Sequence, residues 1–278
     1  MRTIGLSILH NELLSPAVTG EWMKPHGHAS SLATSIGAPW EIYRVALPVS
    51  RGSERTRVSD IYTKAGGQAG YGSIFALSPD HGVGFSINVA GLRAGSARWA
   101  IREAVGATFL PVFEAAAADY AAEAFAGTYV DPNSEQTNIT LTVDPDLPGL
   151  GLEGFWVEGA DWRSNMSVAF GAGAGIEEDV SIRLIPNEVI AENGDMGFWA
   201  ITSPRPVTPR SGVEGGELMF ETSCTTWQSL AFNSFGGYLL EQFIIGTEDG
   251  VAKSIAWPFS AGNGLLPGPD IKLEKVEA

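Results

Sequence analysis

The chain of 278 residues is poor in several groups that define common classes of protein. It has one cysteine, Cys224, so no disulfide can form within the chain and no zinc site can be built on a cysteine cluster. It has only 17 Lys and Arg against 32 Asp and Glu, which gives a formal net charge of −15. Because binding to phosphates needs a basic face, this balance argues against a nucleic-acid partner, and it would repel an anionic membrane.

Long hydrophobic runs are missing as well. No stretch of 18 consecutive apolar residues occurs, so the sequence predicts no membrane-spanning helix and no membrane partner. The first residues, "MRTIGLSILHNELL", contain a single basic residue and no cleavage-site pattern, and therefore do not predict a signal peptide. We expect a cytoplasmic protein.

The residues that are present predict a folded, β-rich chain with a few helices. Apolar residues make up 44% of the sequence and charged residues 18%, while 34 Gly and 16 Pro supply many turns. Residues 3–14 carry a helical apolar stripe, and residues 16–23 predict a short helix with Ser15 as N-cap and Pro16 in its first position. Residues 96–125 predict a longer helix, and we expect a kink or break near Leu110 because Pro111 follows it.

Strand patterns fill most of the remaining chain. Residues 40–47 alternate loosely, and three further runs joined by short turns predict antiparallel hairpins at 58–64, 71–78 and 83–90. Eight more runs after Gly127 predict a barrel or sandwich. They are residues 137–143, 150–157, 180–185, 196–202, 217–222, 224–232, 238–245 and 251–257. We place a domain boundary near residue 126, between domains 1–126 and 127–278.

The first hairpin contains a Lys-x-Gly sequence, Lys64-Ala65-Gly66, at the end of a predicted strand facing a Gly-rich turn. With the segments "LLSPAVTGEWMKPHGHASSLATSIGAPWEIYRV", "IYTKAGGQAGYGSIFALSPDHGVGFSINVAG" and "FAGTYVDPNSEQTNITLTVDPDLPGLGLEGFWVEGADW", the chain resembles the C-terminal part of fungal β-lactamase-related serine hydrolases. These are penicillin-binding-protein-like proteins with an added β domain, and "CTTWQSL" also fits that domain. The resemblance implies an α+β fold, with a truncated β-lactamase-like antiparallel sheet, flanking helices and a following β-barrel or sandwich domain.

Two of the three motifs that the family's mechanism needs are missing from this sequence. No serine is followed by a lysine three positions later, and no Tyr-x-Asn occurs. A Ser-x-x-Lys serine is the nucleophile of this chemistry, and losing a nucleophile usually costs several orders of magnitude in rate. We therefore do not expect β-lactamase, peptidase or esterase activity by that route. In the family an N-terminal strand pairs beside the segment 83–90, and that strand lies before the part of the family that aligns with Met1. Without it, we expect this edge to be uncovered and suited to a homodimer or another partner.

Four residues are candidates for chemistry without that nucleophile. Lys64 could be a retained electrostatic group in a pocket or an ordinary ion-paired lysine, and Tyr62 and Tyr71 flank it with hydroxyl groups. Glu241 lies in the apolar run "YLLEQFII", where alternation places it on the face of Phe243 and where burial would raise its pKa. Glu41, in "PWEIYR", raises the same question; the alternative for both is a glutamate that faces solvent.

The sequence gives no cofactor or metal site that we can support. His26 and His28 have a spacing that can chelate a metal, but no third ligand is evident, and His81 lies in a turn where we expect it to be exposed. The run "GAGAG" at 171–175 does not join a strand to a helix in a dinucleotide-binding unit. We expect neither cofactor nor metal.

Three functions follow from these observations. The first is a cofactor-free enzyme of fungal secondary metabolism, a cyclase or isomerase that binds a small apolar molecule and works by shape and a few polar groups. A barrel with some of the eight tryptophans could hold such a ligand, although these residues could equally form an ordinary core. The second is a non-catalytic binding or interaction protein that uses the sheet edge. The third is part of a serine hydrolase whose catalytic half is missing.

Overall fold

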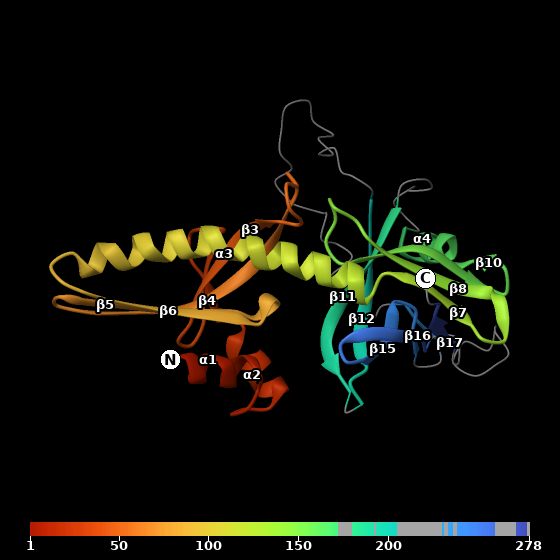
Figure 1. Ribbon diagram of the computed structural model, residues 1–278, viewed down its shortest axis with the longest axis horizontal. Coiled ribbons are helices and arrows are strands. Elements are labelled where there is room, and N and C mark those ends of the chain that lie inside the picture. The colour runs from red at the N-terminus through yellow and green to blue at the C-terminus, as the bar shows by residue number, and fades with distance from the viewer. Residues whose placement is uncertain are drawn as a thin grey trace. The chain divides into compact units, whose positions relative to one another are not determined.

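The computed structural model divides the chain into two compact units, Met1–Ala118 and Asp119–Ala278 (Figure 1). The division falls inside helix α3 (Ala94–Ala124), before the boundary expected from the sequence near residue 126. The structure describes residues 1–171, 180–191, 193–204, 230, 233–235, 238–258 and 271–276.

The first unit is built on a six-stranded antiparallel sheet in the order β1-β2-β3-β4-β5-β6. All four strands predicted between residues 40 and 90 are present, and they form a meander because each is joined to the next by a short turn. Two short strands also occur in the segment 24–39. The strands are β1 (Gly27–His28), β2 (Thr34–Ile36), β3 (Glu41–Pro48), β4 (Thr56–Gln68), β5 (Tyr71–Ser78) and β6 (Val83–Ala90).

Two short helices cover one face of this sheet. Helix α2 (Pro16–Met23) begins as predicted, with the backbone N–H of Val18 donating to Ser15 Oγ at 3.4 Å. Helix α1 (Arg2–Leu9) is shorter than its apolar stripe, because Asn11 adopts a left-handed conformation with φ 56° and ends the helical path. The buried residues of this layer are Ile8, Met23, Trp40, Ile42 and Leu77.

The long helix α3 packs on the opposite face of the sheet. Leu110 of α3 is buried with Ile61, Ile74 and other side chains of that face. The break expected at Pro111 is absent, since α3 is helical from Ala94 to Ala124. Proline removes the hydrogen bond to the carbonyl of Ala107; Ala107 is exposed, so water can solvate that carbonyl and the helix can continue.

The second unit is a closed antiparallel barrel. Eight strands follow one another as β9-β11-β12-β15-β16-β17-β7-β8, and β8 pairs with β9 to complete the ring. The barrel or sandwich expected from the sequence is therefore a barrel, with the two-residue strand β10 (Ala160–Asp161) attached to β9. The eight strands are β7 (Gly127–Asp131), β8 (Ser134–Val143), β9 (Leu150–Val157), β11 (Val180–Ile190), β12 (Met196–Pro204), β15 (Gln242–Glu248), β16 (Val251–Trp257) and β17 (Ile271–Lys275).

Several features of this unit differ from the sequence-based expectation. Strand β7, strand β17 and helix α4 (Trp162–Gly171) were not predicted. The run 238–245 is divided by a turn into β14 (Tyr238–Leu239) and β15, and β14 forms a separate hairpin with β13 (Ser234–Phe235). The runs at 217–222 and 224–232, and the segment "CTTWQSL", lie wholly or almost wholly outside the described residues.

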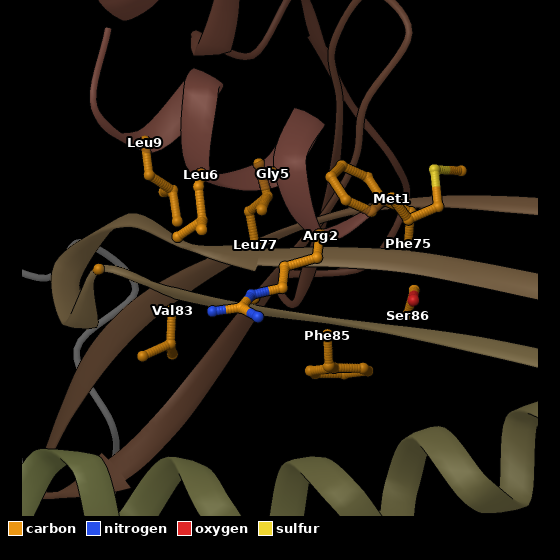
Figure 2. Close-up of a pocket in the computed structure, with 12 residues that line it drawn as sticks. Met1, Arg2, Gly5, Leu6, Leu9, Phe75, Leu77, Val83, Phe85 and Ser86 are labelled. Atoms are coloured by element: carbon orange, nitrogen blue, oxygen red, sulfur yellow. The ribbon is translucent and has the colours of Figure 1, made fainter. Parts of the chain in front are cut away.

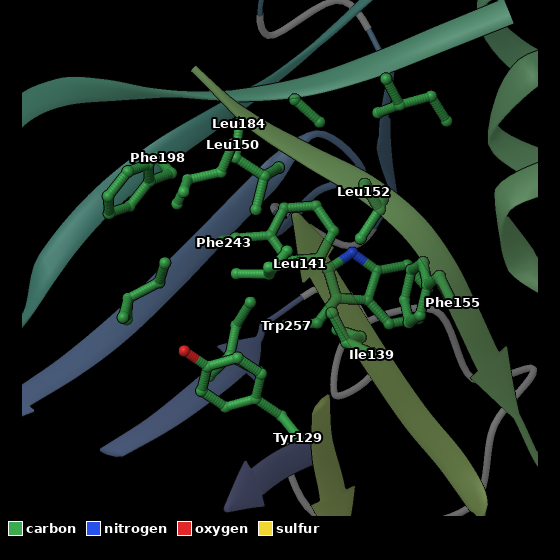
Figure 3. Close-up of a cluster of buried hydrophobic side chains, with 14 of the residues drawn as sticks. Tyr129, Ile139, Leu141, Leu150, Leu152, Phe155, Leu184, Phe198, Phe243 and Trp257 are labelled. Carbon is green, nitrogen blue, oxygen red and sulfur yellow. The ribbon is translucent and has the colours of Figure 1, made fainter. Parts of the chain in front are cut away.

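Aromatic side chains pack inside the barrel (Figure 3). Trp257 is fully buried, with its ring centroid 4.8 Å from that of Phe155 and 4.9 Å from that of Trp162, both edge to face. Its indole N–H donates to the carbonyl of Leu240 at 3.0 Å, so the polar atom of this large ring is paired. These tryptophans therefore belong to a packed core. Among the described residues, no helix combines the length and the apolar character needed to cross a membrane.

Candidate active-site wall

Lys64 lies near the end of β4 and is ion-paired with a carboxylate of the neighbouring strand. Its Nζ donates to Glu41 Oε1 of β3 at 2.5 Å and to the carbonyl of Ala65 at 3.1 Å. The two side chains are 47% and 31% exposed. An ammonium held in this way offers positive charge and hydrogen-bond donors, but it has no lone pair with which to act as a base.

The Glu41 carboxylate is itself positioned by β4. Its Oε2 accepts the backbone N–H of Ala65 at 3.1 Å and the hydroxyl of Thr63 at 3.4 Å, and that hydroxyl also lies 3.0 Å from the Glu41 carbonyl. Glu41 is thus half-buried and bonded to the lysine. It is neither a glutamate that faces solvent nor one enclosed in the core. The sequence raised Glu41 as a candidate without linking it to Lys64, because only the β3–β4 register brings the two together.

The two candidate tyrosines share a sheet face with Lys64 at different distances along it. Lys64 pairs with Phe75 and Tyr62 pairs with Leu77 across β4 and β5, so these four side chains lie on one face. The Tyr62 ring meets Trp40 edge to face at 6.0 Å. Tyr71 is 67% exposed and stands four residues from Phe75 along β5, which is about 13 Å for an extended strand. Tyr62 is therefore a neighbour of Lys64 on this face, and Tyr71 lies further off.

Glu241 belongs to the other unit, in the turn between β14 and β15. It is 0% exposed, as is Phe243 beside it, so the inward placement considered from the sequence is the one observed. Its backbone carbonyl accepts the N–H of Ala200 at 2.8 Å. Glu241 lies in a different compact unit from Lys64.

Two glycines of the Lys-x-Gly hairpin have a packing role. In the sequence, the Gly-rich hairpin resembles part of a catalytic site. Gly67 and Gly72 pair across β4 and β5 on the α3 face, and the Arg98 side chain of α3 lies over them. A Cβ at Gly67 would meet Arg98 Nη1 at 2.6 Å, and a Cβ at Gly72 would meet the Ala94 carbonyl oxygen at 2.8 Å. Arg98 donates to the carbonyl of Gly66. The absence of side chains at 67 and 72 therefore lets the start of α3 pack against the hairpin.

A groove runs between α1 and the outer strands of the sheet (Figure 2). It has a volume of about 330 Å³, and its lining is mainly apolar, with Leu6 and Leu9 from α1 and Phe75 and Leu77 from β5. Figure 2 shows the Arg2 side chain reaching from α1 toward β6. Phe75 and Leu77 pair with Lys64 and Tyr62, so these two candidates share the sheet face of the groove floor, but neither of them lines the groove.

A second polar cluster was missed by the sequence reasoning. The imidazole of His81 is only 1% exposed, so the expectation of an exposed histidine was wrong. Its Nε2 lies 2.8 Å from Glu114 Oε2 of α3, and its Nδ1 lies 2.7 Å from Ser78 Oγ of β5. Arg57 of β4 donates to both oxygens of Glu114, at 2.6 and 2.7 Å, and to Asp80 at 2.8 Å. No local pattern marks this cluster, because its members come from β4, β5, the 3-10 turn Pro79–His81 and α3.

The order Ser78–His81–Glu114 has the distances of a serine–histidine–acid relay, but it cannot receive a substrate. Ser78 is 2% exposed, and Glu114 is tied to the Arg57 guanidinium. Burial acts to raise the pKa of Glu114, and the hydrogen bonds from His81 and Arg57 outweigh it, so that the pKa lies below its usual value. The cluster therefore joins α3 to the sheet as a buried network of charged and polar groups.

The described residues contain no group of three His, Cys, Asp or Glu side chains placed to hold a metal ion. Of the His26 and His28 pair, His28 uses its Nδ1 to hydrogen-bond Ser35 Oγ at 3.0 Å. That contact places His28 in the short β1–β2 ladder at the edge of the sheet.

Comparison with known proteins agrees with the resemblance drawn from the sequence. Residues 117–262 match the family model described as the beta-lactamase-like C-terminal domain. A beta-lactamase-like protein of Arthroderma benhamiae is 26% identical over 93% of this chain, which spans 45% of that protein's length and matches its C-terminal part. The octameric penicillin-binding protein homologue from Pyrococcus abyssi aligns with 96% of this chain and 44% of its own, at 11% identity and a TM-score of 0.26. The chain therefore belongs to the family of proteins that carry the beta-lactamase-like C-terminal domain.

Proposed function

We propose that this beta-lactamase-like chain binds a small apolar molecule in the groove between α1 and strands β5 and β6. The groove itself carries the proposal: at about 330 Å³ it is within the range of small-molecule sites, and aliphatic and aromatic side chains dominate its lining. Phe75 and Leu77 form its floor, and Leu6 and Leu9 of α1 stand over them. An apolar ligand would cover surface that is otherwise open to water.

The polar groups around the groove suggest what such a ligand carries at its ends. Arg2 is the cation that lines the groove, and a guanidinium favours carboxylate or phosphate oxygens. The expected ligand is an apolar body with one anionic group.

The finer proposal is that the bound molecule is rearranged, as by a cofactor-independent cyclase or isomerase. Lys64 and Tyr62 are the candidate groups that pair with the floor residues Phe75 and Leu77, and with Glu41 as its partner Lys64 would act as an electrostatic group. Tyr71 and Glu241 are not required by this proposal. A cytoplasmic location stays a prediction from the sequence.

Two fluorescent probes test the binding site. The probes are 1-anilinonaphthalene-8-sulfonate, which is anionic, and N-phenyl-1-naphthylamine, which is neutral. Leu6→Asp places a carboxylate in the groove and should weaken binding of both probes by about tenfold or more, since a leucine that the ligand covers would contribute about 1.5 kcal/mol or more. Leu13→Asp is the matched control, because Leu13 is 70% exposed and outside the groove lining.

Arg2→Gln separates the charge from the apolar contribution. We expect it to weaken binding of the anionic probe and to leave the neutral probe unchanged. Equal binding by wild type, Leu6→Asp and Leu13→Asp would refute the groove as the site. For the finer proposal, polyketide and terpenoid precursors are incubated with wild type and Lys64→Met, and turnover that is equal in both proteins would remove Lys64 from the mechanism.

A second candidate function is favoured by the length of the fungal relative. The chain spans 45% of the Arthroderma benhamiae protein, so it can be the sheet and barrel part of a serine hydrolase whose nucleophile lies in a separate helical part. The genomic DNA preceding the Met1 codon is the test. An in-frame Ser-x-x-Lys there would support this candidate, and its absence would leave the binding function.

A further inference from the structure

Trp156 stands on the outer surface of the barrel. It lies in β9 between Phe155 and Val157, which are buried in the core, whereas Trp156 itself is 42% exposed. Successive side chains of a strand point to opposite faces, so this ring points outward. Its indole N–H has no hydrogen-bond partner in the part of the chain that the structure describes, in contrast to the N–H of the buried Trp257.

A glycine beside Trp156 keeps part of its ring uncovered. Gly154 lies two residues earlier in β9 and therefore on the same outer face. A Cβ at Gly154 would come within 3.8 Å of Trp156 Nε1, so the indole lies next to the gap that the missing side chain leaves. A large side chain at position 154 would press on the ring, and glycine leaves that edge open to a ligand.

Uncharged amide groups face this ring from β8. Asn138 lies directly opposite Trp156 in the ladder of β8 and β9. Gln136 shares its outer face, since Thr137 between them is buried. Together with Gly159, from the turn after β9, these residues line a hollow of about 240 Å³ without contributing a charge to it.

The amide of Asn138 retains most of its hydrogen-bonding capacity. Its Nδ2 donates to the carbonyl of Glu135 at 3.0 Å, which uses one of its two N–H groups. The second N–H and the lone pairs of Oδ1 can serve a ligand. The hollow is smaller than sites for drug-sized molecules usually are, so it suits a single small ring.

A ring that carries both C–H and hydroxyl groups fits this surface. In a pyranose sugar the C–H bonds on one face carry a slight positive charge, and the face of an aromatic ring is negative. The hydroxyl groups around the sugar can donate to amides and accept from them. A wholly apolar ligand would instead cover the amides of Gln136 and Asn138 without pairing them.

We propose that this face of the barrel binds a neutral oligosaccharide, with one sugar ring stacked on Trp156. Gln136 and Asn138 then exchange hydrogen bonds with the hydroxyl groups of that ring, and the indole N–H supplies a further donor. The remaining sugars lie along the surface outside the hollow. The site belongs to the barrel unit and the groove to the sheet unit, so the proposal goes beyond the proposed function and does not depend on it.

The charge of the barrel unit favours a neutral ligand over an anionic one. Residues 1–118 contain 10 of the 17 Lys and Arg and 8 of the 32 Asp and Glu, so they carry a formal charge of +2. The remaining 7 basic and 24 acidic residues give residues 119–278 a formal charge of −17. This unit would repel phosphorylated or acidic sugars, but not neutral ones.

A cation can also stack on a tryptophan, but the carboxylate opposite the ring is already engaged. Asp161 of β10 pairs with Trp156 of β9. Its Oδ1 accepts the backbone N–H of Ser164 at 3.1 Å, and its Oδ2 accepts the hydroxyl of the same residue at 2.5 Å. The carboxylate is therefore directed toward the start of α4, which favours a sugar over a cation at the ring.

Both strands of the site are part of the closed barrel. Strand β8 is paired on one side with β7 and on the other with β9, and β9 is paired with β8 and β11. The outer face that carries Trp156 and Asn138 is therefore fixed by pairing within the barrel unit itself.

Nuclear magnetic resonance of the nitrogen-15-labelled full chain is the first test. The 8 tryptophans each give an indole N–H signal, and the signal missing from Trp156→Phe identifies that of Trp156. Titration with cellotetraose and with triacetylchitotriose should shift this signal and leave that of the buried Trp257 in place. The concentration dependence of the shift gives the dissociation constant.

Two variants disturb the site in different ways, and the binding of both is measured by calorimetry. Trp156→Ala removes the ring and should weaken sugar binding by about tenfold or more. Gly154→Leu keeps the ring but covers its open edge, and it should weaken binding as well. Tyr238→Ala is the matched control, because Tyr238 is an aromatic residue of the same unit, 40% exposed and outside the hollow. Far-ultraviolet circular dichroism must show the same fold for all three variants.

Three results would overturn the proposal. They are a Trp156 signal that neither sugar shifts, sugar binding that is equal in wild type, Trp156→Ala and Gly154→Leu, and a Trp156 signal that moves with tetramethylammonium chloride but with neither sugar. Failure of the probe experiments on the groove would count against the proposed function alone, since those experiments use other ligands and variants.

Discussion

Charged residues of the sheet unit are used mainly as partners for one another. Lys64 is ion-paired with Glu41, and Glu114 is bonded to both Arg57 and His81. The two sets differ in burial. The Lys64–Glu41 pair is partly open to water, where ion pairs contribute about 0–1 kcal/mol, whereas the side chains of Glu114 and His81 are 8% and 1% exposed. The buried set should therefore matter more for stability, although it drew no attention in the sequence.

Glu114→Gln tests the buried set through its pH dependence. At pH 7 we expect it to lower the free energy of unfolding by about 3 kcal/mol, because Arg57 loses its buried partner. The pKa of Glu114 is depressed in the folded chain, so its stabilisation is complete above the unfolded pKa, near 4.3, and is lost as the pH falls through the lower folded value. Urea unfolding between pH 7 and pH 3 should show wild type and variant converging toward low pH.

Glu103→Gln is the control for this measurement. The Glu103 side chain is 71% exposed and pairs with the neighbouring Arg102, so we expect a change within about 0.5 kcal/mol. A gap between Glu114→Gln and wild type that stays constant down to pH 3 would contradict the role given to Glu114.

At the scale of elements, the β4–β5 hairpin shows how one glycine-rich segment can have two interpretations. The sequence pointed to an active-site lining, and the structure shows Arg98 and the start of α3 lying against Gly67 and Gly72. The segment thus fixes how closely helix and sheet approach. Lys64 and Gly66 face the opposite side, so the packing role does not remove the lysine from the groove face.

Gly72→Ala tests this packing. Its Cβ would lie 2.8 Å from the Ala94 carbonyl oxygen, a backbone atom that cannot move aside, and we expect a loss of about 1–3 kcal/mol in urea unfolding. Gly106→Ala, inside α3, would meet only Leu110 Cδ1 at 3.9 Å and should stabilise the chain by about 0.5–1 kcal/mol. A neutral Gly72→Ala would mean that α3 does not press on the hairpin.

Elements with local signals were predicted from the sequence, and those fixed by distant contacts were not. Ser15 and Pro16 marked the start of α2, and short turns marked the hairpins of β4 to β6. Helix α4 had a usable signal that was overlooked, since Asp161 accepts the N–H of Ser164 at 3.1 Å as an N-cap does. Strand β17 is held by β16 and β7, and its buried Leu273 alternates with charged residues in a segment too short to stand out.

The candidate site follows the same rule. Lys64 and Tyr62 could be predicted as candidates because they lie in or next to the Lys-x-Gly motif. Glu41 could be predicted as a candidate, but its ion pair with Lys64 could not. The groove could not be predicted, because α1 lies over β5 and β6 only after the sheet has formed. The network of Glu114 joins residues 57 apart in the chain, and no pattern of single residues reveals such a contact.

On the scale of the whole molecule, the two units differ in charge as much as in architecture. The sheet unit is close to neutral, and the barrel unit carries −17. Like charges on one compact unit repel, and salt screens that repulsion. The acidity of the sequence therefore describes the barrel unit, and conclusions about partners of the sheet unit cannot be taken from the overall charge.

Differential scanning calorimetry at low and high salt tests this difference. Raising NaCl from about 50 to about 500 mM should raise the midpoint of the barrel transition by roughly 3 °C and change that of the sheet transition less. Glu114→Gln identifies the sheet transition, because Glu114 belongs to that unit. If salt raised both midpoints equally, repulsion between the acidic residues of the barrel unit would not be the cause of the shift.

The ring of strands in the barrel also sets the timing of its own formation during protein synthesis. Strand β7 begins at Gly127 and pairs with β17, which ends at Lys275, so the first and last strands of the ring are neighbours. A ribosome must therefore make almost the whole unit before the ring can close, whereas the sheet meander can pair as each strand emerges. Pairings between residues so far apart in the chain form slowly. The nascent barrel would thus expose open strand edges for most of its synthesis, the stage at which a chaperone would be most useful to it.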